Sequence, residues 1–277
     1  MLLPCMERRV ELELVCRRDA DIGTFLKSEG FSGRLLSYIK ADAPYRLTDR
    51  IYAGDILPVR LPDENNGAEP CGSVPVIYED EHYILADKPP CMPVHRTCGH
   101  ERDTLENVFG GKPFGFHVIN RLDMDTTGLC LIAKHAYAVT ECDKEYTALC
   151  GGIVRGEHLR IDAPLLWDGR MKCDPCGKRA VTDVYPVGYG DSCTLVRCRL
   201  ETGRRHQIRA HMAHIGHPLL GDALYGGDMS AAKRQALHCS YVRFVHRITG
   251  ETMEFTSDLH HDMMTIVKID NIKPRNL

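Results

Sequence analysis

The sequence predicts an α+β fold in which a small N-terminal domain precedes a predominantly antiparallel mixed sheet. Many segments rich in Val, Ile, Thr and Tyr follow one another with few helical segments between them, which favours antiparallel pairing over βαβ units. A polar stretch rich in Pro, Gly and Asn, residues 62–73, is the best linker candidate. The 277 residues suffice for one large and one small domain, which we expect at residues 71–277 and 1–70.

The first domain has the pattern of a small mixed unit. Residues 10–15 alternate between apolar and polar side chains, as in a strand, and residues 22–28 and 32–40 have the spacing of short helices. Gly54-Asp55 predicts a turn before the next apolar segment, residues 56–59. A unit of this size either packs against the second domain or carries a binding surface of its own.

The second domain begins with a predicted hairpin, in which residues 76–78 and 83–86 flank the acidic tip Glu79–His82. Further strands are predicted at residues 144–149, 180–185 and 194–200, and a turn at Thr249-Gly250 joins the last two, residues 241–248 and 251–256.

Composition excludes some functional classes. The formal net charge of −3 gives no global attraction to nucleic acid, so a nucleic-acid site would need a local positive surface. No signal peptide is evident and no segment approaches the length of a membrane span, so we expect a cytoplasmic protein that does not bind membranes. The thirteen cysteines follow no regular framework, so we expect reduced thiols that serve mostly as small core residues.

The stretch from Asn120 to Lys134 is the most informative part of the chain. A short polar turn with two carboxylates and an arginine leads through Gly128 into the apolar run Leu129–Ala133, which predicts a buried strand. A strand that enters a core would hold the residues before it rigidly, as a nucleophile or a general base requires. On spacing alone, an ordinary Asp-rich turn capped by Thr126 or Thr127 would be the preferred explanation of the segment.

A second polar stretch, Glu201–Pro218, predicts a helix with Thr202 as N-cap and Gly216 at its C-terminal end. Ile208, Met212 and Ile215 would form its buried stripe. Arg205 and Arg209 lie four residues apart, and near exposed backbone N–H groups they would suit an anion, either RNA phosphate or a carboxylate.

Metal binding is the alternative for this helix, but the spacing does not favour it. The four histidines at 206, 211, 214 and 217 do not have the spacing of four residues, with a nearby acid, that is typical of catalytic zinc sites. Cys173-Asp174-Pro175-Cys176 is a single CxxC that reads as a turn. We therefore expect no metal ion.

Taken together, the motifs resemble the RluA family of RNA pseudouridine synthases. The match runs from about Val76 to Asp258. Its segments are Asp87-Lys88-Pro89-Pro90, Arg121-Leu122-Asp123-Met124-Asp125-Thr126-Thr127-Gly128-Leu129, Lys144–Leu149, Thr202–His211, Gly216–Asp222 and Leu224-Tyr225-Gly226. The resemblance implies a sheet of the pseudouridine synthase type and a reaction that needs no cofactor.

The resemblance also implies roles for individual residues. Asp123 would be the essential catalytic residue, Tyr146 would lie against the target base, and Arg209 would pair with Asp123 and keep its carboxylate ionised. Arg121 would fill the space left by a flipped base. The remaining substrate-binding residues implied by the Thr202–His211 motif are Arg204, Arg205, His206, Gln207 and Ile208.

Three positions depart from the family pattern. Asn120 replaces the usual His before Arg-Leu-Asp, Thr127 replaces a Ser, and Cys91 replaces a Gly. Thr keeps the hydroxyl, but Asn cannot titrate near neutrality, so the resemblance implies no imidazole chemistry at position 120.

The first domain resembles an S4-type RNA-binding module in Ser32–Leu36 and Gly54-Asp55, although the Val-Asn-Gly segment of such modules is absent. A packing domain is the equal alternative.

The function that follows is isomerisation of uridine to pseudouridine in structured RNA, ribosomal or transfer, by a monomer that flips its target base. Two alternatives remain at this stage. One is a non-catalytic RNA-binding or ribosome-assembly factor, and the other is a metal-dependent hydrolase built on the histidine-rich segment.

Overall fold

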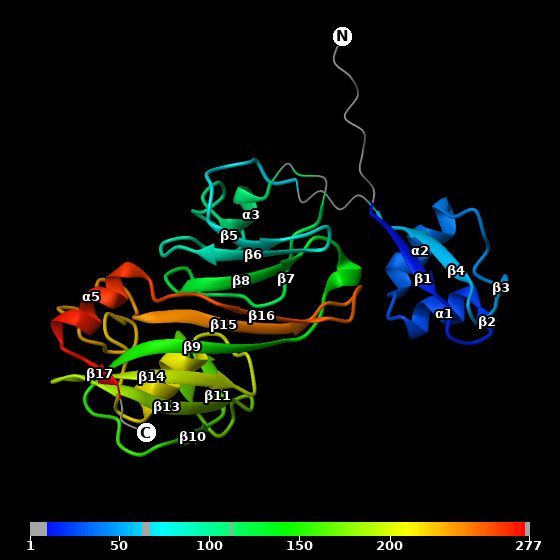
Figure 1. Ribbon diagram of the computed structural model, residues 1–277. Helices are drawn as coiled ribbons and strands as arrows, with labels where there is room; N and C mark the ends of the chain where they lie inside the picture. Colours follow the sequence, from blue (N-terminus) through cyan, green and yellow to red (C-terminus); the bar gives the residue numbers. More distant parts are fainter. Residues whose placement is uncertain (1–9, 63–66, 111, 113, 275–277) are drawn as a thin grey trace, which may run out of the picture.

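The computed structural model describes residues 10–62, 67–110, 112 and 114–274. A small N-terminal unit lies beside a larger body built on one extended sheet (Figure 1). Within the described residues, no helix is long and apolar enough to cross a membrane.

The N-terminal unit contains the two predicted helices and two short ladders of strands. Strand β1 pairs with β4, and β2 pairs with β3, in each case antiparallel. Its elements are β1 (Glu11–Val15), β2 (Ala20–Asp21), α1 (Ile22–Ser28), α2 (Gly33–Asp42), β3 (Arg50–Ile51) and β4 (Ile56–Arg60). Helix α2 begins after Ser32, whose hydroxyl accepts from the backbone N–H of Leu35 at 3.3 Å. The apolar side chains of these elements form a core of their own.

The two parts meet at an aromatic contact. Tyr137 of the main body belongs to the N-terminal core, and its ring lies 4.3 Å from that of Phe31. Arg247 of the main body also contacts both sides of this junction. Its guanidinium lies 4.7 Å from the centre of the Tyr137 ring, and its Nη2 donates to the carbonyl of Glu29 at 2.8 Å.

Eleven strands form the sheet of the main body, in the order β10-β13-β14-β9-β15-β8-β6-β5, with β16, β17 and β7 at the sides of β15, β13 and β8. These strands are β5 (Val76–Glu79), β6 (Tyr83–Lys88), β7 (His117–Val118), β8 (Thr127–Ala133), β9 (Cys142–Gly151), β10 (Leu159–Asp162), β13 (Val181–Tyr189), β14 (Cys193–Leu200), β15 (Leu237–Val245), β16 (Thr252–Thr256) and β17 (Lys273–Pro274). The pairing is antiparallel except between β8 and β15, which confirms the predicted mixed, mainly antiparallel sheet.

Strand β8 lies in the middle of this sheet, and all seven of its residues are buried. A strand covered on both faces reads as a continuous apolar run, which explains the signal at Leu129–Ala133. Only two residue pairs join β8 to β15, Thr127 with His238 and Gly128 with Cys239. Gly128 has a φ of +103°, and a Cβ at this position would collide with the carbonyl of Cys239.

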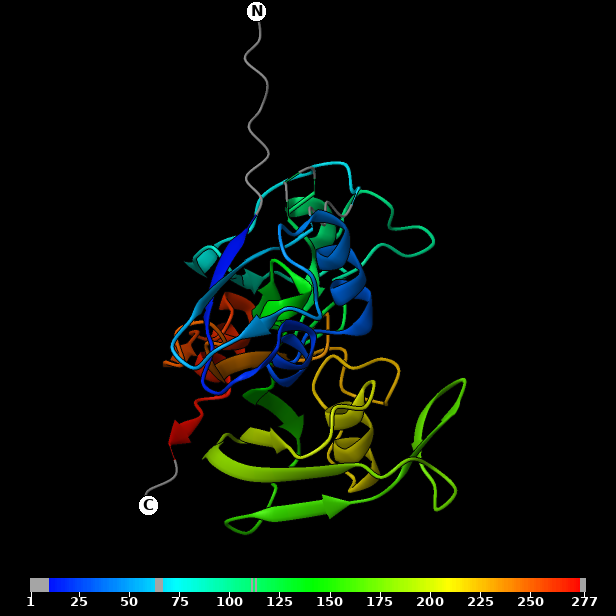
Figure 2. The ribbon, with the colours of Figure 1, turned by 90° about the vertical axis from the view of Figure 1, so that its right-hand side faces the viewer.

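Three helices, a 3-10 turn and a hairpin complete the main body. They are α3 (Leu105–Val108), the turn Ala136–Ala138, the β11–β12 hairpin (Leu165–Asp168 and Arg170–Cys173), α4 (Gln207–His214) and α5 (His261–Ile269). Figure 2 shows α4, in yellow, between the strands of the sheet and the β11–β12 hairpin. The sequence did not predict α3, α5 or this hairpin.

The helix expected from Glu201 begins later, at Gln207, so the prediction of Thr202 as its N-cap is wrong. The Thr202 hydroxyl accepts from the backbone N–H of Val181 at 3.0 Å and donates to the Gln207 side chain at 2.8 Å. His206 precedes the helix with a φ of +50°, in the left-handed region. The stripe was predicted correctly at Ile208 and Met212, which are buried in the main core.

Part of the predicted linker is packed rather than free. Residues 63–66 lie outside the described residues, but Ala68 is buried and the carbonyl of Glu69 accepts from Asn107 Nδ2 at 3.0 Å. Residues after 66 therefore attach to the main body beside α3.

The expectation that the cysteines are mostly core residues holds only in part. Six of the twelve described cysteines are buried, but four are exposed, at positions 71, 91, 98 and 176. The described thiols are free.

Candidate active site

Asp123 lies in the turn that enters β8. The backbone N–H of Thr126 donates to the Asp123 carbonyl at 3.1 Å and closes the turn. Leu122 is buried, whereas the Asp123 side chain keeps 27% of its surface exposed. The turn therefore presents this carboxylate at the surface of a rigid core.

Asn120 fixes the chain before this turn to β8. Its Nδ2 donates to the Leu129 carbonyl at 2.9 Å, and its Oδ1 accepts from the Leu131 backbone N–H at 2.6 Å. The side chain is 1% exposed. This amide acts as a strand partner, so the residue that replaces the family's His has a structural role here.

Two buried cations donate hydrogen bonds to backbone carbonyls of the turn. Lys88 Nζ donates to the Met124 carbonyl at 2.7 Å, and Arg234 Nη1 donates to the Asp125 carbonyl at 2.8 Å. Burial lowers the pKa of Lys88 to about 8. Arg234 is in turn held by Asp262 of α5 through two hydrogen bonds of 2.7 and 2.8 Å. The turn is thus braced by residues far away in the sequence.

The two other departures from the family pattern also lie around the turn. Thr127 is buried, and its hydroxyl lies 2.9 Å from His238 Nδ1. Cys91 has a φ of +58°, in the region that favours glycine, and its backbone N–H donates to Asp125 Oδ1 at 3.2 Å. Cys91 therefore keeps the left-handed backbone conformation that explains the family's usual glycine at this position.

Arg209 joins Asp123 to a second, fully buried carboxylate. Its Nη1 donates to Asp123 Oδ2 at 3.2 Å, while Nε and Nη2 donate to Asp222 at 2.7 and 2.9 Å. Burial disfavours the charged guanidinium, but the neighbouring carboxylates outweigh it and raise the pKa of Arg209. The paired fork of this arginine thus binds Asp222, and Asp123 receives a single hydrogen bond.

Tyr146 and His206 complete the walls around Asp123. Burial raises the pKa of Tyr146 well above its usual value, so its phenol stays protonated. His206 Nε2 lies 3.8 Å from Asp123 Oδ1, and its Nδ1 lies 3.3 Å from the hydroxyl of Tyr225. Burial lowers the pKa of His206, which favours the neutral ring.

The structure brings all nine predicted site residues to two adjoining cavities. A cavity of about 60 Å³ is lined by Asp123, Tyr146, Arg209, Arg121, Arg204, His206, Gln207 and Ile208. A second, of about 460 Å³, shares Arg121, Asp123, His206 and Arg209 and adds Arg205.

Two of these nine residues offer few free polar groups to the cavities. The amide of Gln207 donates to the Val181 carbonyl at 2.9 Å and to Thr182 Oγ1 at 3.0 Å, and Ile208 is buried in the main core. They shape the wall, whereas Arg121, Arg204 and Arg205 line the cavities with exposed side chains.

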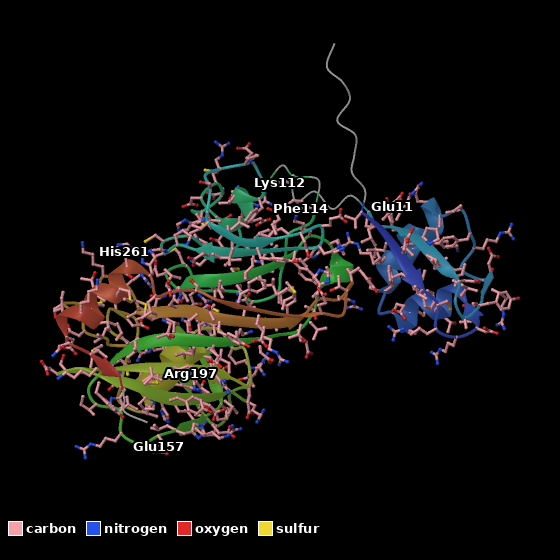
Figure 3. The ribbon with its side chains drawn as sticks, viewed as in Figure 1. Glu11, Lys112, Phe114, Glu157, Arg197 and His261 are labelled. Carbon is pink, nitrogen blue, oxygen red and sulfur yellow. The ribbon has the colours of Figure 1, made fainter. Side chains whose placement is uncertain are left out.

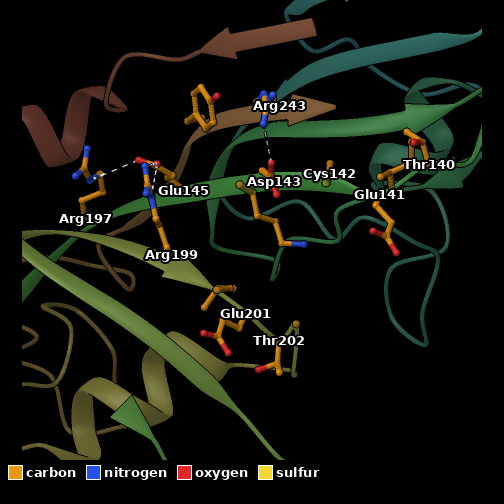
Figure 4. Close-up of a pocket in the computed structure, with 15 residues that line it drawn as sticks. Thr140, Glu141, Cys142, Asp143, Glu145, Arg197, Arg199, Glu201, Thr202 and Arg243 are labelled. Carbon is orange, nitrogen blue, oxygen red and sulfur yellow. Dashed lines mark hydrogen bonds and ion pairs between the residues drawn. The ribbon is translucent and has the colours of Figure 1, made fainter. Parts of the chain in front are cut away.

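A larger groove adjoins the site where β9 and β14 separate after the pair Glu145–Arg199. It has a volume of about 1070 Å³, and Leu200 lines both this groove and the small Asp123 cavity. Figure 4 shows Glu145 between Arg197 and Arg199, and Asp143 beside Arg243. Arg197 is also labelled in Figure 3, over the part of the sheet that contains β9 and β14.

The histidines of the second motif point to different places. His211 contacts Thr182 Oγ1 at 2.8 Å and the Ala163 carbonyl at 2.9 Å, while His217 contacts the Gly151 carbonyl at 2.9 Å. Across the described part of the chain, no three His, Cys, Asp or Glu side chains are grouped as metal ligands.

Comparison with known proteins identifies the family. A model described as RNA pseudouridylate synthase matches residues 82–214. The uncharacterized RNA pseudouridine synthase YjbO of Bacillus subtilis (strain 168) is 35% identical over 244 residues, covering 79% of this chain and 85% of that protein. The chain belongs to the RNA pseudouridine synthase family. The ribosomal large subunit pseudouridine synthase D of Zymomonas mobilis is also 35% identical, over 237 residues, with 73% of this chain and 74% of that protein covered.

Solved structures agree on the fold. Human RNA pseudouridylate synthase domain containing 1 superposes with a TM-score of 0.60 at 21% identity, covering 76% of this chain and 92% of that chain. Human RNA pseudouridylate synthase domain containing 4 gives a TM-score of 0.59 at 20% identity, with 73% and 94% covered. The sequence-based prediction of a pseudouridine synthase fold is confirmed, and the chain is an isomerase that converts uridine to pseudouridine in RNA.

Sequence reasoning assigned no role to four residues that support the site: Lys88, Asp222, Arg234 and Asp262. Lys88 and Asp222 lie inside quoted motifs, so their positions were visible but their partners were not. Arg234 and Asp262 carried no local signal, because each is explained only by a contact across the fold.

Proposed function

We propose that this pseudouridine synthase modifies uridine in ribosomal RNA and that Asp123 is its essential catalytic residue. The observation that supports the assignment most is the linked set of Asp123, Arg209 and Asp222 beside Tyr146. Several curated relatives named ribosomal large subunit pseudouridine synthase D support the ribosomal target.

The reaction needs a carboxylate and an enclosed base but no cofactor. The N1–C1′ bond breaks, uracil rotates, and a C5–C1′ bond forms. The proton on C5 is lost and N1 gains one, so substrate and product are isomers. Asp123 attacks C1′ or C6, or removes a sugar proton. Each route uses the carboxylate form, to which Arg209 Nη1 donates a hydrogen bond at 3.2 Å.

A uridine inside an RNA helix cannot reach Asp123, so it must leave the stack at a cost of a few kcal/mol. Tyr146 forms the wall on which the extruded uracil would stack. Arg121 is exposed at the mouth and, among the described residues, has no carboxylate partner. Its planar guanidinium is therefore available to fill the space that the base leaves.

Mapping of pseudouridine in total RNA from cells with and without the gene tests this proposal. We expect loss of signal at one or a few ribosomal positions, restored by the wild-type gene and not by Asp123→Asn. Loss confined to transfer RNA would reject the ribosomal target but keep the enzyme assignment, and no change in either RNA would reject both.

We also propose that residues 1–70, a small domain and its linker, add RNA affinity to a catalytic domain at residues 71–277. Exposed basic side chains lie on or next to its two helices, at Arg18, Lys27, Arg34 and Lys40. Removal of residues 1–66 spares the segment packed beside α3, so the catalytic domain should fold. RNA affinity should fall and depend less on salt. Unchanged affinity and salt dependence would instead indicate a packing domain.

A further inference from the structure

The single tryptophan of the chain, Trp167, is half exposed. It lies in β11, near the end of the β11–β12 hairpin, with 50% of its surface accessible. Gly169, with a φ of +67°, forms the turn of this hairpin. In Figure 2 the hairpin is the yellow-green pair of strands that extends away from the sheet at the right. Half of this large aromatic surface is therefore open to solvent.

The hairpin is attached to the active-site side of the body at its base, through Leu165, and beside its turn, through Arg170 and Met171. Leu165 is buried against Ala210 of α4 and Tyr225. The backbone N–H of Met171 donates to the Tyr225 hydroxyl at 3.1 Å, and Arg170 Nη1 donates to the Leu224 carbonyl at 2.7 Å. Because Tyr225 also contacts His206, the hairpin is fixed relative to the Asp123 cavities.

Trp167 carries an arginine on its face. The guanidinium of Arg205 lies 4.5 Å from the centre of the indole, within cation–π range. Arg205 is exposed, and no carboxylate in the described part of the chain pairs with it. The same arginine lines the cavity of about 460 Å³ that contains Asp123. The stacked pair therefore borders the catalytic mouth and offers an aromatic plane beside an uncompensated positive charge.

We propose that Trp167 and Arg205 form a platform for an unpaired RNA base that neighbours the target uridine. The inference rests on the proposed function, since it concerns the RNA that enters the Asp123 site. An indole and a guanidinium both stack on bases of any sequence, and the arginine charge also attracts the phosphate beside that base. The platform would thus favour substrates in which the nucleotide next to the target is unstacked.

The test measures binding and needs no turnover. Decauridylate labelled at one end reports affinity by fluorescence anisotropy, and the sole tryptophan reports contact, because a stacked base quenches indole emission. Trp167→Ala should weaken decauridylate binding by about 5- to 150-fold, the range for loss of one base–aromatic stack. Trp167→Phe should recover most of the affinity. Leu166→Ala is the matched control, since Leu166 is 41% exposed on the same strand but on its other face.

Two further probes separate stacking from phosphate binding. An abasic oligonucleotide of the same length should bind Trp167→Ala and the wild type equally, and a fully paired duplex should leave the indole emission unchanged. The proposal is wrong if bound decauridylate does not quench the emission, if Trp167→Phe binds as weakly as Trp167→Ala, or if abasic binding weakens to the same extent. Absence of pseudouridine formation by the wild type would reject the proposed function without altering these binding results.

Discussion

Two sets of cations surround Asp123, and they differ in what neutralises them. Lys88, Arg209 and Arg234 are 1%, 7% and 8% exposed, and each binds carbonyls or carboxylates of the protein itself. Arg121 and Arg205 are exposed at the mouth, and among the described residues neither has a carboxylate partner.

The difference assigns separate tasks to the two sets. A buried cation whose hydrogen bonds are all used inside the protein fixes geometry and cannot gain much from RNA. An exposed cation without a partner keeps its charge available for phosphate or a base. Substitutions in the buried set should therefore change turnover or stability, and those at the mouth should change affinity and its salt dependence.

The largest effect is expected at the carboxylate between the two sets. Asp123→Asn should lower the single-turnover rate of pseudouridine formation by more than about 1000-fold, because a neutral amide can act neither as nucleophile nor as base. RNA affinity and thermal stability should stay near wild type. Asp125→Asn, in the same turn, is the matched control and should keep most of the activity. A rate for Asp123→Asn of even a tenth of wild type would reject its essential role.

The buried set is tested next by Arg209→Lys. Lysine keeps the charge but cannot bind Asp222 with a fork while reaching Asp123, so the carboxylate should be misplaced and turnover should fall about 100-fold. RNA affinity should change little. Arg60→Lys, at an exposed arginine that pairs with Glu11, controls for the chemical change. A loss confined to RNA affinity would place Arg209 with the cations of the mouth.

Lys88 should contribute to stability in a pH-dependent manner. Lys88→Met leaves carbonyls of Pro89, Met92 and Met124 without their donor, so the free energy of unfolding at pH 7 should fall by about 2–4 kcal/mol. The folded-state pKa of Lys88, about 8, lies below its ordinary value of 10.5, so between these values the unfolded chain binds the extra proton. Stability of the wild type therefore gains up to about 3 kcal/mol from this group as pH rises through that window.

Urea unfolding of both proteins from pH 7 to 10.5 measures this contribution. The gap between wild type and Lys88→Met should widen as the pH rises, whereas Lys40→Met, at an exposed lysine, should follow the wild type. A gap that stays constant or narrows would show that burial does not disfavour the charged form of Lys88.

The smallest effect is expected at the mouth. Arg121→Ala should weaken RNA binding by about 5- to 10-fold and lower the salt slope by about one, while Arg121→Lys should keep the slope and lose the planar contact. Titrations of labelled RNA at several salt concentrations distinguish these cases. An unchanged slope for the alanine variant would mean that Arg121 does not contact phosphate.

Local signals in the sequence predicted the elements better than the contacts of the site. The apolar run of β8, the hairpin β5–β6 and helix α2 depend on neighbouring residues, and each was predicted. Thr202 is of a residue type common at N-caps, but its hydroxyl binds the side chain of Gln207, and the helix begins only at Gln207.

The same limit applies to charges. The resemblance implied that Arg209 pairs with Asp123. In the structure, Arg209 makes its two-hydrogen-bond contact with Asp222 instead, a carboxylate that is buried. Arg234 braces the turn from the loop before β15, and Asp262 of α5 holds Arg234 in place. No periodicity encodes such a pair. The sequence could not show which carboxylate each buried arginine binds, because these residues become neighbours only in the fold.

The narrow parallel join between β8 and β15 also bears on how the molecule assembles. It connects residues far apart in the chain by only two pairs, and the catalytic turn lies directly beside it. Closing so long a loop for so few hydrogen bonds is unfavourable until both halves of the sheet exist. We therefore expect the active site to form last during folding and to open first under denaturant, so activity should disappear before the secondary structure does.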